Sequence, residues 1–167
     1  MNYEMVLMRI LHIGFGFLWA GAALSVIVIL GRRLRELGAD YQRPVMRVVA
    51  RVIGPMLGIS GIVTILVGLA MALRIAGSNH SLFTSTGWGW AIMIGFAVSV
   101  AGLISGIMLS NAAGRAVALS ESNGEGSSTS ADEMQLDKLS GRTAALGHVT
   151  AGLVFIGVLS MAVARFV

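Results

Sequence analysis

The chain has 167 residues, of which 56% are hydrophobic and only 12% are charged. In soluble proteins about a quarter of the residues are charged, so this composition predicts an integral membrane protein. The chain has no cysteine, which excludes disulfides and thiolate metal sites, and its net charge of +4 comes from basic residues beside apolar runs, so no nucleic-acid partner is expected.

The first apolar run covers residues 10–31 and contains one ionisable side chain, that of His12. A helix of this length, rising ~1.5 Å per residue, spans the ~30 Å core of a bilayer. The run has neither a basic leader nor a small-residue cleavage site. We therefore expect a membrane helix and no cleaved signal peptide.

An ionisable side chain within a membrane helix is costly, so it usually turns toward other helices and finds a partner or a ligand there. His12, Gly16 and Trp19 share one helical face, and Gly16 leaves room for a flat cofactor beside the imidazole. Arg9, one turn above His12, is placed to neutralise a carboxylate of such a cofactor. In the alternative interpretation, His12 hydrogen-bonds a neighbouring helix and Arg9 reaches the lipid headgroups.

Three further apolar runs follow, at residues 52–73, 88–114 and 144–164. Nine of the 12 Lys and Arg residues fall in the two loops after the first and third runs, which the positive-inside rule assigns to the cytoplasm. We therefore expect an all-α, integral membrane four-helix bundle, a single transmembrane domain over residues 1–167. It would be a multi-pass protein of a bacterial inner membrane, with both termini outside.

The connection after the third run differs in composition from the rest of the chain. Residues 119–137 are rich in Ser, Gly and acidic residues, which predicts a flexible cytoplasmic linker without a catalytic role. The second and third runs carry GxxxG spacings, at Gly54–Gly58 and Gly102–Gly106, that let helix backbones approach closely. These faces suit either packing within the bundle or a homodimer or larger membrane complex.

Depth in the membrane limits which histidines can share a ligand. His12 lies near the outer end of the first run and His148 near the inner end of the fourth, roughly 18 Å apart along the membrane normal. His80, in the outer loop, is therefore the favoured second ligand, and two imidazoles suffice to hold haem iron in a helix bundle. Arg9 and Arg74 would then lie near the haem propionates.

Two alternatives concern the second ligand and a second site. If His80 stays in solvent, Met93 or Met71 is at a suitable depth to be the second axial ligand. His148 precedes Gly152 by one turn, which repeats the arrangement in the first run. This pattern admits a second haem or metal site near the inner end, with Met56 and Met108 at comparable depth. A hydrogen bond within the bundle is the other interpretation of His148.

The first run, LHIGFGFLWAGAAL, resembles the opening helix of a group of small bacterial membrane proteins. The resemblance rests on Leu11, His12, Trp19 and Gly21. The group includes the copper-resistance CopD domain and HemJ, the haem-linked protoporphyrinogen oxidase. The resemblance implies that His12 binds haem, as in HemJ, or copper, as in CopD. HemJ proteins carry a Lys early in the third span, where this chain has Ile92.

Together these features predict a membrane-embedded b-type haem protein with haem b as its cofactor. Its role would be electron transfer with an unidentified redox partner, or sensing or reduction of a small molecule as a haem-dependent oxidoreductase. A copper-handling permease and a cofactor-free structural subunit are the alternatives. No acidic residue lies within the four apolar runs, which argues against a carboxylate relay for protons or cations.

Overall fold

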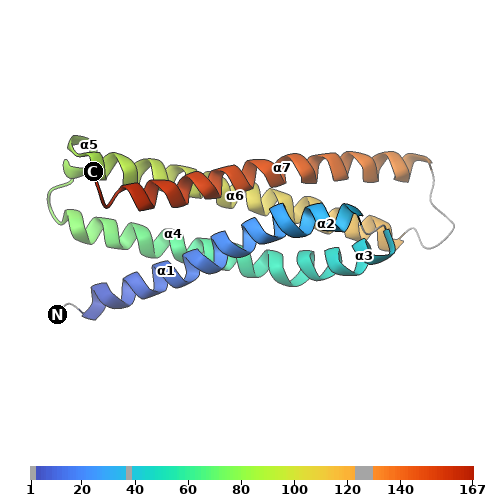
Figure 1. Cartoon of the computed structure of the whole chain (residues 1–167), viewed down its shortest axis with the longest axis horizontal. Coiled ribbons are helices and arrows are strands. Elements are labelled where there is room, and N and C mark those ends of the chain that lie inside the picture. Colours follow the sequence, from blue (N-terminus) through green and yellow to red (C-terminus); the bar gives the residue numbers. More distant parts are fainter. Residues whose placement is uncertain (1–2, 37–38, 123–129) are drawn as a thin grey trace.

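The computed structural model describes residues 3–36, 39–122 and 130–167, and helices joined by short turns account for these ranges, with no strand among them. The long helices run side by side along the length of the molecule (Figure 1). The N- and C-termini lie at one end of the bundle, here called the termini end. Helices α2 and α3 lie at the opposite end, here called the linker end (Figure 1).

The elements in chain order are α1 (Tyr3–Leu24), η1 (Ser25–Leu30), α2 (Gly31–Glu36), α3 (Ala39–Val48), η2 (Val49–Ile53), α4 (Gly54–Ala76), α5 (Leu82–Ser85), α6 (Gly87–Ser122) and α7 (Ser130–Val163). The segments η1 and η2 are π-helical turns without a break in the helix. The N–H of Gly31 donates to the carbonyl of Val26, and the N–H of Gly54 donates to that of Val49. Such wider turns insert one residue into a helix.

In the part of the chain that the structure describes, four continuous helical stretches are long and apolar enough to cross a membrane, namely Tyr3–Leu30, Pro44–Ala76, Gly87–Glu121 and Ser130–Val163. Each overlaps one of the four predicted apolar runs. The all-α architecture with four helices of membrane-spanning length is therefore confirmed. Apolar helices of this length fit a multi-pass membrane protein in contact with a lipid bilayer.

Small side chains fill the interior, whereas large apolar side chains cover the outside. Ser60 is only 2% exposed, but Ile10, Phe17 and Leu66 are 62%, 81% and 60% exposed. Lipid tails are as apolar as leucine, so helices in a bilayer associate through close contacts of small residues instead of burying large apolar ones. This distribution is the one expected of a bundle that lipid surrounds.

The four long helices form two closely packed pairs, because α1 packs mainly against α4 and α6 mainly against α7. A Cβ added at Gly102 of α6 would lie 3.4 Å from Leu153 of α7, and the hydroxyls of Ser105 and Thr150 hydrogen-bond at 2.8 Å. The close helix contact predicted at Gly102 is thus made between α6 and α7 of the same chain. Gly58, by contrast, meets nothing within 4 Å.

Helix replaces much of the predicted flexible linker. Residues 119–122 belong to α6 and residues 130–137 to α7, while residues 123–129 lie outside the described ranges. The two helices have 36 and 34 residues, so at ~1.5 Å per residue both are longer than the ~30 Å bilayer core. Once their apolar parts are packed, each further residue adds a hydrogen bond without a new nucleation cost.

Candidate functional site

A cleft opens between the two helix pairs at the termini end, with a volume of about 1670 Å³. Its lining comes from all four long helices, and Trp19, Ala20 and Val154 of the central apolar cluster form its floor. The lining is mainly apolar. The polar and charged side chains in the lining are those of Arg9, His12, Thr64, Ser99 and Arg165, and none of the lining residues is Asp or Glu.

The imidazole of His12 is oriented by a main-chain atom of the neighbouring helix. Its Nδ1 lies 2.9 Å from the carbonyl oxygen of Thr64. A carbonyl only accepts hydrogen bonds, so Nδ1 carries the proton and donates it. In the neutral ring, Nε2 then keeps its lone pair, and within the described part of the chain it has no hydrogen-bond partner. This is the state in which a histidine can bind a metal.

The same ring lies against a position that has no side chain. A Cβ at Gly68 would be 2.6 Å from Cε1 of His12, 3.0 Å from Nδ1 and 3.6 Å from Nε2. The absence of a side chain at Gly68 therefore leaves the space that the imidazole occupies beside α4. Nε2 is the ring nitrogen farther from this contact.

The whole face predicted from the first apolar run is turned toward α4. The facing pairs are His12 with Gly68, Gly16 with Thr64 and Trp19 with Gly61. Antiparallel helices meet with residue numbers whose sum is constant, and each of these pairs adds up to 80. The large side chains of His12 and Trp19 thus meet glycines on α4. His12 hydrogen-bonds the neighbouring helix, as the alternative interpretation predicted, and it also lines the cleft.

Three methionines line the cleft together with His12. Met71 comes from α4, Met93 from α6 and Met161 from α7. Met93 and Met71 were the thioether candidates predicted from depth, and Met161 is added by the fold. Within the described ranges, no group of three or more His, Cys, Asp or Glu residues could hold a metal ion.

The arginines at the termini end divide into two kinds. Arg9 and Arg165 line the cleft and form no ion pair or hydrogen bond with another described residue. Arg74, predicted as a propionate partner, instead pairs with Glu4 and does not line the cleft. The fold therefore adds Arg165, at the end of the fourth apolar run, to Arg9 as a second cation in the lining of the cleft.

The other two histidines lie outside the cleft. His80 is exposed in the turn before α5 and is not among the lining residues. His148 is exposed on α7, and its Nδ1 lies 2.7 Å from the carbonyl oxygen of Ala144 in the same helix. The structure thus brings neither of them to His12, and the second ligand in the cleft would have to be a thioether.

Sequence reasoning missed Gly68, Thr64, Arg165 and Met161 as site residues. The sequence does contain a pattern that could have identified Gly68: Gly61 and Gly68 are seven residues apart, as are His12 and Trp19. In an antiparallel pair of helices, equal spacings allow both contacts at once. No local pattern marks the carbonyl of Thr64, since every residue has one.

Comparison with protein-family models, with curated proteins and with solved structures finds no match to this chain.

Proposed function

We propose that the cleft binds haem b, with His12 as the axial ligand through Nε2, and that the protein is a membrane-embedded b-type haem protein. The observation that carries this proposal is the hydrogen bond from Nδ1 of His12 to the carbonyl of Thr64. Metal-binding histidines usually donate their other ring N–H to a carboxylate or a backbone carbonyl, which sets the tautomer and the ring orientation.

The remaining lining suits an amphipathic porphyrin. Most ligand pockets have volumes of about 300–1,000 Å³, so a cleft of about 1670 Å³ can accommodate a large planar group. Apolar side chains would contact the macrocycle and exclude water from it. Arg9 and Arg165, which are unpaired among the described residues, would bind the two propionates at the termini end.

A methionine of the cleft would hold the haem iron together with His12, and Met93 and Met71 are the two that the sequence also predicts for this role. A His/Met pair raises the reduction potential relative to a purely histidine-bound haem. Haem supplies one-electron chemistry when bound. The chain's own contribution is to orient the imidazole, exclude water and neutralise the propionates, which fits electron transfer or small-molecule sensing and reduction.

The test is an optical spectrum of the full chain, purified in detergent from haem-replete cells. We expect a Soret band that is lost in His12→Ala and kept in His148→Ala and His80→Ala, which serve as matched controls. Gel filtration and helical circular dichroism show whether each variant is folded. A colourless, folded wild-type protein would overturn the proposal, as would a His12→Ala variant with full haem content.

Copper handling is the second candidate, because one observation favours it specifically. Met71, Met93 and Met161 line the same cleft as His12, and thioether and imidazole are ligands that suit Cu(I). Metal analysis of the purified protein separates the two candidates. Bound copper that is lost in a Met93→Leu/Met161→Leu variant, without any porphyrin absorption, would favour the CopD-like function over the HemJ-like one.

A further inference from the structure

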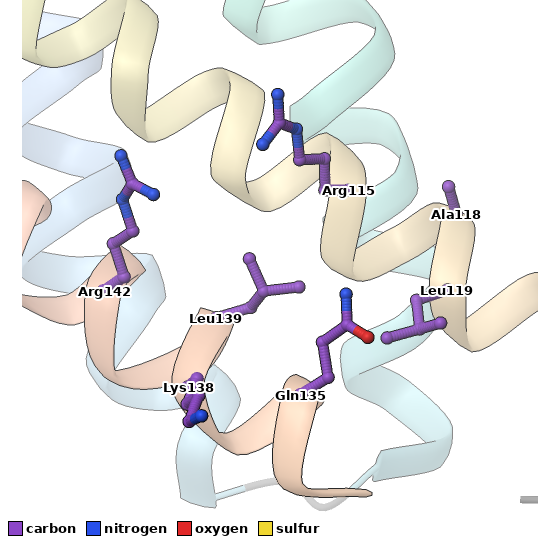
Figure 2. A pocket seen from close by; sticks show the side chains of 7 residues that line it. All are labelled: Arg115, Ala118, Leu119, Gln135, Lys138, Leu139 and Arg142. Carbon is purple, nitrogen blue, oxygen red and sulfur yellow. The ribbon is translucent and has the colours of Figure 1, made fainter. Parts of the chain in front are cut away.

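A second pocket, of about 530 Å³, lies at the linker end between α6 and α7. It lies at the opposite end of the bundle from the cleft and shares no lining residue with it. Figure 2 shows Gln135, Leu139 and Arg142 rising from α7 toward α6, with Lys138 on the same helix and Arg115 on α6. The lining residues are Arg115, Ala118, Leu119, Gln135, Lys138, Leu139 and Arg142.

Three cations line this pocket, and no Asp or Glu side chain is among its lining residues. None of the side chains of Arg115, Lys138 and Arg142 forms an ion pair or a hydrogen bond with another residue in the described ranges. Like charges gathered around a cavity repel one another, and an anion placed among them relieves that repulsion. The pocket thus has the electrostatics of an anion site.

Other cations at the same end of the bundle are neutralised within the chain. Arg47 and Arg51 pair with Glu121 at 2.7 and 3.0 Å, and Arg33 pairs with Glu36 at 2.9 Å. Among the cations at this end whose side chains the structure describes, those of the pocket are therefore the unpaired ones. This contrast provides the matched control for an experiment.

The position along the helices indicates what kind of anion could reach the pocket. Arg115 directly follows the third apolar run and Arg142 closely precedes the fourth, so both lie where a membrane helix leaves the hydrocarbon. Phosphate groups of lipids occupy this level. Ala118, Leu119 and Leu139 add an apolar wall beside the cations, so the pocket can contact both a headgroup and its apolar neighbour.

We propose that this pocket binds the phosphate group of an anionic phospholipid at the linker end of the bundle. Arginine binds phosphate through parallel N–H donors, and basic pockets between membrane helices are suited to lipid headgroups. Arg115 holds the phosphate from α6, and Arg142 and Lys138 hold it from α7. The bound lipid thereby bridges the two helices at the end where they leave the membrane.

The test uses the delipidated full chain in detergent, titrated with short-chain phosphatidylglycerol, phosphatidylcholine or inorganic phosphate while thermal unfolding is followed. We expect saturable stabilisation by phosphatidylglycerol alone. In Arg115→Gln/Arg142→Gln the apparent affinity should fall about tenfold or more, because two charge-assisted contacts are lost. The control Arg33→Gln/Arg51→Gln removes the same charge from the same end and should keep the wild-type affinity.

Three results would overturn the proposal. Equal losses in both double variants would show a response to net charge and not to the pocket. Equal stabilisation by phosphatidylcholine would show that the anionic headgroup is not recognised, and equal affinity for inorganic phosphate would assign the pocket to a soluble anion. If the double variant fails to fold, Lys138→Gln is the alternative, because this side chain is exposed and its replacement should not disturb folding. This single variant should also bind phosphatidylglycerol more weakly than the wild type. An unchanged affinity would overturn the proposal.

Discussion

His12 donates its Nδ1 proton to the carbonyl of Thr64 over 2.9 Å, and this bond joins the first membrane-length helix to the second at the wall of the cleft. The hydroxyl of Thr64 does not compete for the imidazole, because it donates to the carbonyl of Ser60 at 2.8 Å. A carbonyl has two lone pairs, so that of Thr64 can accept both a helix hydrogen bond and the imidazole. The orientation of His12 therefore depends on the backbone and on the space around the ring.

Gly68→Ala should displace the imidazole. The added methyl group would lie 2.6 Å from Cε1 of His12, so the ring must move and the bond to Thr64 must lengthen. We expect a loss of about 1–3 kcal/mol in the free energy of unfolding, as for overpacked interiors, together with lower haem content. Thermal unfolding and the Soret absorbance per protein measure the two effects.

Gly58→Ala is the matched control for that substitution, because it lies on the same helix and its Cβ would meet nothing within 4 Å. Replacing glycine by alanine in an open helical position removes backbone freedom from the unfolded chain, so stability should be unchanged or slightly higher. A Gly68→Ala protein that behaves like Gly58→Ala would show that the ring does not rest on α4.

Trp19→Ala should destabilise the bundle by about 3–5 kcal/mol, the usual cost of removing a buried aromatic side chain. Trp19 is 7% exposed and packs on Gly61 at the floor of the cleft, so its loss leaves a cavity. Phe17, on the same helix, is 81% exposed, and Phe17→Ala should change stability by no more than about 0.5 kcal/mol. Denaturation in detergent, followed by circular dichroism, compares the two; equal losses would contradict the packing described.

Arg9→Gln and Arg165→Gln should each weaken haem binding about tenfold, since a charge-assisted hydrogen bond to a propionate contributes roughly that factor. Arg74→Gln should have little effect on affinity, because Arg74 pairs with Glu4 and does not line the cleft. Haem titration of the apoprotein measures the three dissociation constants. If Arg74→Gln weakens binding as much as the other two, the propionates lie elsewhere.

The orientation in the membrane can be tested because the natural chain has no cysteine. Ser78→Cys introduces a thiol in the exposed turn at the termini end, and Ser130→Cys introduces one at the exposed start of α7. We expect a membrane-impermeant maleimide added to intact cells to label Ser78→Cys only. Labelling of Ser130→Cys alone would reverse the predicted orientation, in which both termini lie outside.

The linker end shows where composition misleads. Residues 130–137 contain Ser, Asp, Glu, Gln and few large apolar residues, which predicts disorder for an isolated segment. In the structure they form the first turns of α7. They extend a helix that is already formed by packing against α6, and local composition carries no information about that support.

Hydropathy and charge by themselves determined the four membrane-length helices and that the face formed by His12, Gly16 and Trp19 turns toward another helix, because the bilayer imposes length and polarity on each helix separately. Only the tertiary structure decided what that face meets. It placed Gly68 and the carbonyl of Thr64 beside the imidazole, added Arg165 and Met161 to the cleft, and left His80 in the exposed turn. These choices depend on the register between antiparallel helices, which many distant small-residue contacts set together and which no single segment encodes.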